Sequence, residues 1–311
     1  MQISVIIPVF NSAETIAKAL ESVVKQTMQP AEIIVVDDGS TDQTARIVKS
    51  FQAKIPIRYH YQSNKRQAAA RNLGASQAKG DWLAFLDSDD IWLPNKLAVQ
   101  LEQLKKYPEL DGVIGNYKII EDGQSKKFVP DIIKGENFSP AVLLTANFFW
   151  LPVVLIKKST FVKLNGFDES FRNAEDIDLG FRFCKSSQYR VFPQVIAHYL
   201  RRAKSSSQQE IHDINGQKKF YRKVLERSDL TKEEGDVAKD RLSFWLDREE
   251  LFLIRRAAVL DGQLAGLKRF WATMISRRKS MKAIGLGVLL LIPGSINYLK
   301  KTRWKNLDFE A

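Results

Sequence analysis

Residues 83–92, LAFLDSDDIW, decide the fold class, because an apolar run ends in three carboxylates within four residues. The apolar part is typical of a buried strand in a parallel sheet. Asp87, Asp89 and Asp90 follow it directly, and their like charges repel one another. A turn that faces water tolerates such a cluster, whereas a divalent cation converts the repulsion into binding. The surrounding sequence has to distinguish these two interpretations.

The first 115 residues alternate short apolar runs with helical patterns, which is typical of βαβ units and a mostly parallel sheet. We expect strands at ISVIIPVF (3–10), IRYHYQ (57–62) and DWLAFLD (81–87), and another within AEIIVVDDGSTDQT (31–44) that ends in acids and a turn. Helices are expected near 16–24, after residue 44, at 66–80 and at 94–108. Asn11 and Glu14 have the spacing of an N-cap residue and its N3 partner, which predicts that the first helix starts there.

A less regular region runs from about residue 111 to 200, and the chain becomes helical and charged from about 208. The uncharged run at 137–156 matches a bilayer in length. Pro140, Asn147 and Pro152 interrupt it, so we expect a helix followed by a buried strand. Asn147, Phe149 and Trp150 in this run would face either an acceptor or the core. The single cysteine, Cys184, lies among apolar residues and suits a reducing compartment.

Acids follow two strands of the predicted sheet, Asp37 and Asp38 after one and the 87–90 cluster after another. In parallel α/β sheets, ligands bind beyond the carboxyl ends of the strands. Neither glycine-rich phosphate motif, G-x-G-x-x-G or G-x-x-x-x-G-K, is present in the sequence. A nucleotide bound at this edge would therefore need Mg²⁺ or Mn²⁺, held by one or two carboxylates, to neutralise its phosphates.

Four segments together give a specific resemblance: SVIIPVFNSAETIAKALESVVKQT, EIIVVDDGSTDQT, AAARNLGASQAKGDWLAFLDSDDIW and GFDESFRNAEDIDLGFR. In their order and spacing they resemble the inverting family-2 glycosyltransferases of GT-A fold. The resemblance implies an α/β fold with a mostly parallel central sheet flanked by helices. It implies a GT-A domain at 1–205, with a nucleotide-binding half (1–115) and an acceptor-binding half (111–205). The charged helical pattern that begins near residue 208 predicts a helical basic C-terminal extension at 206–311.

The resemblance also implies a role for each matched residue. The residues implied to contact the nucleotide sugar are Pro8, Phe10, Glu14, Asp38, Arg71, Asp87, Ser88, Arg201 and Arg202. Asp89 would ligate the metal, and Asp90 would either ligate it or support a ligand. His198 is a candidate ligand or an ordinary partly buried histidine, because the relatives' histidine aligns nearer Ala203.

Glu175 and Asp176 begin a predicted helix, where acids are stabilised by the helix dipole and can act as caps. The resemblance instead makes Asp176 the catalytic base and Glu175 its acceptor-orienting neighbour. Inverting transfer needs a carboxylate that takes the proton of the acceptor hydroxyl while a metal stabilises the departing diphosphate. No covalent intermediate is required, so no nucleophile is expected.

We therefore expect a metal-dependent inverting glycosyltransferase of cell-surface polysaccharide biosynthesis. The expected donor is a UDP-sugar, with GDP- or dTDP-sugars as alternatives, and the expected acceptor is a glycan or a lipid-linked molecule. A sugar-phosphate nucleotidyltransferase is a second possibility, but PVFNSAET (8–15) lacks the glycine-rich basic loop that such enzymes need. A third is a membrane-docked nucleotide-binding protein without catalytic activity.

The positive charge concentrates at the C-terminal end. Of the net charge of +12, residues 251–311 supply twelve Lys or Arg against three Asp or Glu. An uncharged run at 283–299, flanked by basic residues and by Trp304, predicts a membrane-associating segment at 282–305 that docks on anionic lipid. The alternative is an ordinary packed helix. No nucleic-acid module accompanies the charge and no secretory signal precedes it, so we expect a cytoplasmic enzyme at the inner face of the membrane.

Overall fold

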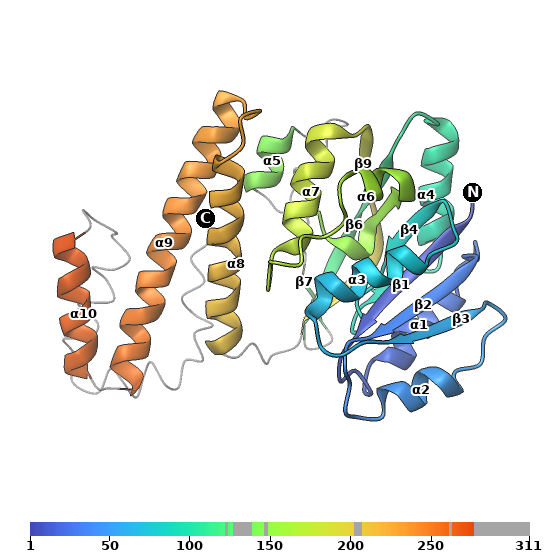
Figure 1. The fold of residues 1–311 in the computed structure, drawn as a ribbon, viewed down its shortest axis with the longest axis horizontal. Coiled ribbons are helices and arrows are strands. Elements are labelled where there is room, and N and C mark those ends of the chain that lie inside the picture. The colour runs from blue at the N-terminus through green and yellow to red at the C-terminus, as the bar shows by residue number, and fades with distance from the viewer. Residues whose placement is uncertain (122–123, 127–138, 146–148, 202–206, 261–262, 277–311) are drawn as a thin grey trace. The chain divides into compact units, whose positions relative to one another are not determined.

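The computed structural model describes residues 1–121, 124–126, 139–145, 149–201, 207–260 and 263–276 (Figure 1). The chain forms two compact units. The first contains residues 1–206 and 227–237, and the second contains the remaining helical residues. The functional division of residues 1–205 into nucleotide-binding and acceptor-binding halves stays a prediction.

Four parallel strands form one half of the sheet in the first unit. They are β1 (Ile3–Val9), β2 (Glu32–Asp37), β3 (Ile57–Tyr61) and β4 (Trp82–Phe85), in the order β3-β2-β1-β4. Every residue of β1, β2 and β4 is buried, which explains why these strands are continuous apolar runs rather than alternating ones. The strands predicted from the sequence are confirmed here.

The other half of the sheet is mixed. It continues from β4 through β8 (Val154–Lys157), β6 (Gly112–Glu121), β9 (Tyr189–Arg201) and β5 (Ile91–Trp92), with β7 (Gln124–Lys126) paired to β6. Strands β6 and β9 are parallel, but β8 is antiparallel to both β4 and β6. The predicted α/β sheet is thus confirmed, and its parallel pairing is concentrated in the first 85 residues.

Helices flank the sheet, as predicted (Figure 1). Those of the first unit are α1 (Ile16–Val24), α2 (Thr44–Ser50), α3 (Arg66–Gln77), α4 (Lys96–Lys106), α5 (Pro140–Thr145), α6 (Lys158–Lys163) and α7 (Glu175–Ser186), with a 3₁₀ turn η2 (Leu151–Val153). The second unit contains α8 (Ser207–Leu225), α10 (Gln263–Ser276) and most of α9 (Lys232–Leu260).

The predicted N-cap at Asn11 is wrong. Helix α1 begins at Ile16, after Thr15, and Thr15 makes no side-chain cap hydrogen bond. Asn11 has a positive φ of 48°, and its Oδ1 accepts a hydrogen bond of 2.8 Å from the backbone N–H of Thr41. The side chain therefore joins the loop after β1 to the loop after β2, and this contact replaces capping.

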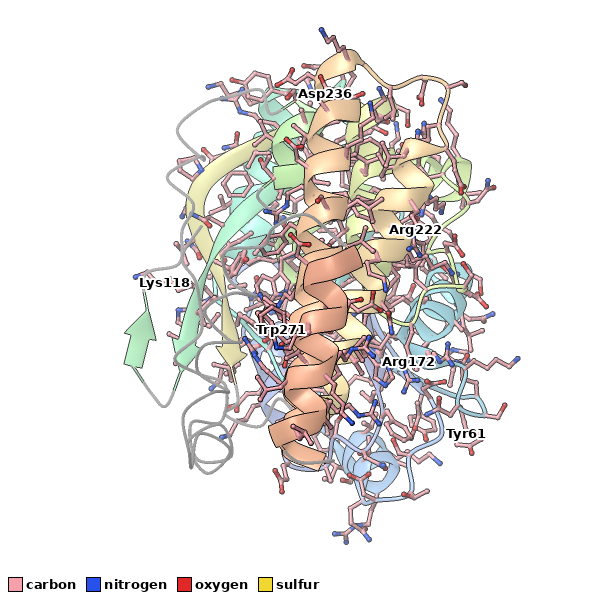
Figure 2. The ribbon with its side chains drawn as sticks, turned by 90° about the vertical axis from the view of Figure 1, so that its left-hand side faces the viewer. Tyr61, Lys118, Arg172, Arg222, Asp236 and Trp271 are labelled. Carbon is pink, nitrogen blue, oxygen red and sulfur yellow. The ribbon has the colours of Figure 1, made fainter. Side chains whose placement is uncertain are left out.

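Two features of the second unit bear on the predicted membrane association. On α10, Leu264 and Trp271 are 67% and 57% exposed, and Figure 2 labels Trp271. No helix in the described ranges is both long enough and apolar enough to cross a bilayer. The predicted segment 282–305 lies outside the described residues.

Helix α3 packs against β1 and β2. The close contact is made at Gly74, where an added Cβ would lie 2.5 Å from Cγ2 of Ile6. Ile6 is fully buried in β1, so it has little space in which to move. The missing side chain at Gly74 thus sets the distance from α3 to the sheet, and with it the position of Arg71 one turn earlier.

We predict that Gly74→Ala lowers the free energy of unfolding by about 1–2 kcal/mol. Overpacking a core costs about 1–3 kcal/mol, and the better helix propensity of alanine returns up to about 1 kcal/mol. Ser76→Ala, at an exposed position of the same helix, should change stability by less than about 0.5 kcal/mol. Urea denaturation followed by tryptophan fluorescence measures both; equal stability of the two variants would contradict the packing argument.

Candidate functional site

The loops that follow β1, β2 and β4 meet at one edge of the sheet. Ser12 joins all three, because its backbone N–H donates to Thr44 Oγ1 (2.8 Å) and its hydroxyl lies 2.7 Å from the Ser88 hydroxyl. Asn11 adds a bond from its N–H to Ser40 Oγ. Sequence analysis did not single out Ser12, although it lies in the polar strand end PVFNS. The polar strand ends predicted to share a ligand site are therefore held together directly.

Arg71 of α3 is the buried cation of this site, with its side chain 3% exposed. Its Nη2 is 2.6 Å from Asp87 Oδ1, its Nη1 is 2.6 Å from Glu175 Oε1, and its Cζ lies 5.6 Å from the ring centroid of Phe167. Burial alone would lower the pKa of Arg71, but the charges of Asp87 and Glu175 raise it above its usual value. One guanidinium thus joins the acid cluster after β4 to the acid pair at the start of α7.

Asp176 is half-buried beside this bridge, and its Oδ1 accepts a hydrogen bond of 2.8 Å from the N–H of Ile177. Burial is the main cause that raises its pKa, and the charge of Glu175 adds to it, so that the pKa reaches about 7 despite the opposing charge of Arg71. A carboxyl with a pKa near neutrality is suited to exchange protons with a reacting group. The predicted helix beginning at Glu175 is confirmed.

The remaining acids after β4 lie in different environments. Asp89 is half-buried, whereas Asp90 is 2% exposed and accepts a hydrogen bond from the N–H of Leu200 through Oδ1 (3.1 Å). Burial raises the pKa of Asp90 well above its ordinary value, and the charges of Asp87 and Asp89 add to the effect. The β5–β9 pair places His198 opposite Ile91, next in sequence to Asp90. Burial and the charge of Lys118 lower the pKa of His198, which favours the neutral imidazole that binds metals.

The donor set fits a divalent cation that takes part of its ligands from a substrate. In the part of the chain that the structure describes, no three His, Cys, Asp or Glu side chains are grouped as a metal site. Mg²⁺ is usually held by one or two carboxylates together with substrate phosphates and water. Asp89 and Asp90 would supply such carboxylates. Burial and then the charges of Asp87 and Asp89 raise the pKa of Asp90, and a cation would offset those charges.

The other predicted nucleotide-contacting residues are spread over the same edge. Pro8 is buried in β1 opposite Val36, Phe10 is 50% exposed directly after β1, and Glu14 is exposed before α1. Asp38 is buried, and its Oδ1 accepts hydrogen bonds of 2.7 Å from both Gln62 and the backbone of Lys65. Arg201 ends β9, and its side chain, like all of Arg202, lies outside the described residues.

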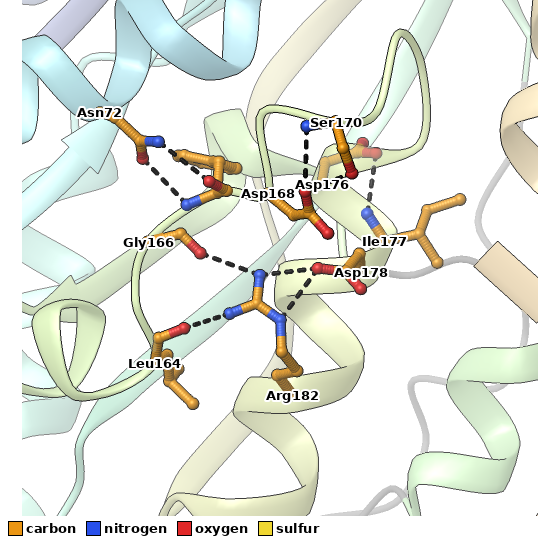
Figure 3. Close-up of polar contacts among 10 residues, drawn as sticks. Asn72, Leu164, Gly166, Asp168, Ser170, Asp176, Ile177, Asp178 and Arg182 are labelled. Atoms are coloured by element: carbon orange, nitrogen blue, oxygen red, sulfur yellow. Dashed lines mark hydrogen bonds and ion pairs between the residues drawn. The ribbon is translucent and has the colours of Figure 1, made fainter. Parts of the chain in front are cut away.

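Two side chains that sequence analysis missed hold the loop leading into α7 (Figure 3). Asn72 donates from Nδ2 to the carbonyl of Phe167 and accepts from its N–H, both at 2.9 Å. Arg182 donates to Asp178 Oδ2 (2.7 Å) and to the carbonyls of Gly166 (2.8 Å) and Leu164. The i,i+4 spacing of Asp178 and Arg182 is the signal that predicts this pair.

The first turn of α7 is reached through a residue in an unfavourable conformation. Ala174, directly before Glu175, has a positive φ of 74°, which costs a residue with a side chain about 1–2 kcal/mol. Such conformations persist only where the surroundings fix them, and they cluster at functional sites. Here the bonds made by Asn72 and Arg182 fix the loop, so Glu175 and Asp176 are presented from a rigid support.

Comparison with known proteins supports an enzymatic site. The profile of the family described as "Glycosyl transferase family 2" matches residues 4–169. An uncharacterized glycosyltransferase of Rickettsia prowazekii is 29% identical over 272 residues, which are 85% of this chain and 83% of that protein. An uncharacterized glycosyltransferase of Rickettsia felis is 35% identical over 175 residues. These are 56% of this chain but only 29% of that longer protein.

A solved structure has the same architecture. The structure of S. aureus TarS residues 1–349 in complex with UDP-GlcNAc matches with a TM-score of 0.63 at 20% sequence identity. The match covers 96% of this chain and 84% of that one. At this identity the likeness establishes the fold.

We predict that Arg71 and Glu175 are strongly coupled in stability. Arg71→Met should lower the free energy of unfolding by about 3–5 kcal/mol, because it leaves buried Glu175 without a counter-charge. Glu175→Gln should be less destabilising, since Asp87 still pairs with the guanidinium. The double variant should be more stable than the sum of the two effects, by about 1 kcal/mol or more. Chemical denaturation of all four proteins measures the coupling, and strict additivity would contradict the bridge.

Proposed function

The chain belongs to glycosyl transferase family 2 and is therefore a glycosyltransferase, and we propose that it moves a sugar with inversion from a UDP-sugar to a glycan or lipid-linked acceptor. The GT-A-type fold expected from the sequence is confirmed by the family and by the likeness to TarS. The observation that carries the proposal is the bridge made by Arg71, which joins the Asp87 loop to Glu175 at 2.6 Å on each side.

A UDP-sugar is the proposed donor because the similar TarS fold is known in complex with UDP-GlcNAc. In this chain the nucleotide would lie over the loops after β1 and β2, against the exposed ring of Phe10 and beside Asp38. The bonds from Gln62 and from the backbone of Lys65 are both made to Oδ1, and Oδ2 would accept a hydrogen bond from a nucleobase N–H. GDP- and dTDP-sugars remain the alternatives that a donor panel distinguishes.

The proposed Mg²⁺ or Mn²⁺ would be held by Asp89, with Asp90 and His198 as further ligands. Family-2 glycosyltransferases generally use a divalent cation, and the acids after β4 provide the oxygen ligands it prefers. When bound, such an ion supplies positive charge to the diphosphate leaving group. Asp87, paired with Arg71, is held in place and is free to contact the ribose as the resemblance implies.

Asp176 is the proposed general base. Its raised pKa makes it basic enough to take the proton of an acceptor hydroxyl as the glycosidic bond forms. Glu175 is anchored by Arg71 and would orient the acceptor rather than take the proton. Because the sugar inverts, attack and departure occur on opposite faces, and no residue has to bind the sugar covalently.

The setting of the reaction is also proposed. The basic residues gathered in 251–311 support docking of segment 282–305 on an anionic inner membrane face, which would bring the site near a lipid-linked acceptor. This placement suits an enzyme of cell-surface polysaccharide synthesis that works from the cytoplasm. Residues 1–115 would then bind the nucleotide, and residues 111–205 would bind the acceptor.

We predict that radiolabel transfer occurs from one nucleotide sugar in a panel of UDP-, GDP- and dTDP-sugars, with a membrane extract as the acceptor and Mn²⁺ present. Asp176→Asn and Asp89→Ala should each lower turnover by about 10²–10⁴-fold, because they remove the base and a metal ligand. The matched control is Glu109→Gln, an exposed carboxylate between α4 and β6, which should stay within about twofold of wild type. Near-wild-type turnover by Asp176→Asn would refute the assignment of the base.

The raised pKa of Asp176 predicts a pH dependence. The base must be ionised to take a proton, so kcat/KM should fall about tenfold per pH unit below about pH 7. Glu175→Gln removes a charge that raises the pKa of Asp176, so the acid limb of its residual activity should move to lower pH. A pH–rate series on both proteins tests this; an acid limb that stays in place, or moves up, would contradict the assignment.

A further inference from the structure

Three aromatic side chains from separate segments of the first unit contact one another. The ring centroid of Trp150, directly before η2, lies 4.4 Å from that of Tyr117 in β6 and 5.4 Å from that of Tyr199 in β9. All three residues are half-buried, so part of each residue is accessible to solvent. We call these three residues the aromatic platform. Neither the proposed nucleotide contacts nor the proposed proton transfer uses them.

A local irregularity of the sheet sets the position of Tyr117. The parallel pairing of β6 with β9 shifts register on both sides of Asn116. Asn116 is buried, and its Oδ1 accepts a hydrogen bond of 2.8 Å from the N–H of Tyr117. Bulges of this kind re-aim the next side chain and are common beside active sites. Tyr117 then pairs with Ala197, whose small side chain leaves space for larger rings on this face.

The aromatic platform borders the acids of the site. Burial is the largest cause that raises the pKa of Tyr117, to about 12, and the charges of Asp176 and Asp90 contribute to it. Leu200, the residue after Tyr199, donates its N–H to Asp90. The Tyr117 hydroxyl therefore stays protonated at neutral pH and lies within the electrostatic reach of the proposed base.

Phe149, the residue before Trp150, lies in a different environment. Phe149 is fully buried, and its ring packs so closely on α7 that a Cβ at Gly180 would lie 2.5 Å from its Cγ. It also contacts Phe183, with a centroid distance of 6.0 Å. Of the two aromatic residues that the sequence left open as core or acceptor-facing, Phe149 belongs to the core. Trp150 projects to the other side, toward Tyr117 and Tyr199.

We propose that the aromatic platform is a carbohydrate-binding subsite that takes a pyranose ring of the acceptor through its apolar face. The inference rests on the proposed function, since it assigns an acceptor class to the same site. A pyranose presents C–H groups on a face and hydroxyls at its rim, which suits flat rings with polar tips. A sugar stacked on Trp150 would have its rim hydroxyls beside Tyr117 and Asp176. An isoprenoid chain needs an apolar groove and gains nothing from the neighbouring charges.

Saturation-transfer difference NMR on the full chain, with UDP and Mg²⁺ present, tests the subsite without turnover. The probes are methyl β-glucoside, methyl β-galactoside and methyl N-acetyl-β-glucosaminide, with geranyl phosphate as the lipid arm. We expect at least one glycoside to show its strongest saturation at ring C–H protons. In Trp150→Ala and Trp150→Leu the signal should fall at least fivefold, while Trp150→Phe keeps most of it. The matched control is Tyr107→Ala, because Tyr107 stacks against Arg190 near the start of β6.

The outcomes separate this proposal from the proposed function. Equal glycoside signals in wild type and Trp150→Leu would overturn the subsite, and so would the lack of any signal or a Trp150-dependent signal from geranyl phosphate alone. Calorimetry with UDP and Mg²⁺ reports the donor site separately, and the Trp150 variants should bind UDP within twofold of wild type. A wild-type protein that binds glycosides through Trp150 but binds neither UDP nor any donor would refute the proposed function and leave the subsite standing.

Discussion

The buried guanidinium of Arg71 is the constraint on which the site depends. A cation with 3% of its side chain exposed is stable only if its charge is matched, and here two carboxylates from different parts of the chain match it. That requirement brings the start of α7 against the loop after β4. Gly74 holds α3 against β1, and Asn72 holds the loop before α7, so the bridge is supported on both sides.

The charges of the site do not cancel. Among the described residues of the site, five carboxylates, at positions 87, 89, 90, 175 and 176, lie around Arg71, which pairs directly with Asp87 and Glu175. The imbalance, together with burial, explains why the pKa values of Asp90 and Asp176 are raised. The same excess of negative charge, which is unfavourable by itself, would provide affinity for the proposed cation and its diphosphate. Together with burial, it raises the pKa of Asp176, the proposed base, so the proposed cation binding and proton transfer have a common electrostatic origin.

Local chemistry explains how far the sequence predicts this structure. Sequence patterns predicted the first four strands, the acids at their ends and the start of α7. The apolar pattern of a strand, the residues of a turn and the acids of a first helical turn each depend on residues that are close together in the sequence. The direction of β8 was not predictable, because a four-residue apolar strand can pair either way. Nor was the role of Asn11, whose bond to Thr41 spans 30 residues, or that of Asn72, whose partner Phe167 is 95 residues away. These contacts depend on how distant segments pack together, which cannot be predicted from a short stretch of the sequence.

Arg71 and Asn72 are consecutive residues of one helix, about 100° apart around its axis, and each grips a different loop. In the proposed mechanism, the distance between the departing oxygen of the donor and the carboxylate of Asp176 is therefore set by a single helix, α3. A distance set in this way would stay the same for a larger or a smaller sugar. Proteins of this architecture that use different substrates would then differ in the residues that surround the two substrates, and not in the distance between the donor and the base.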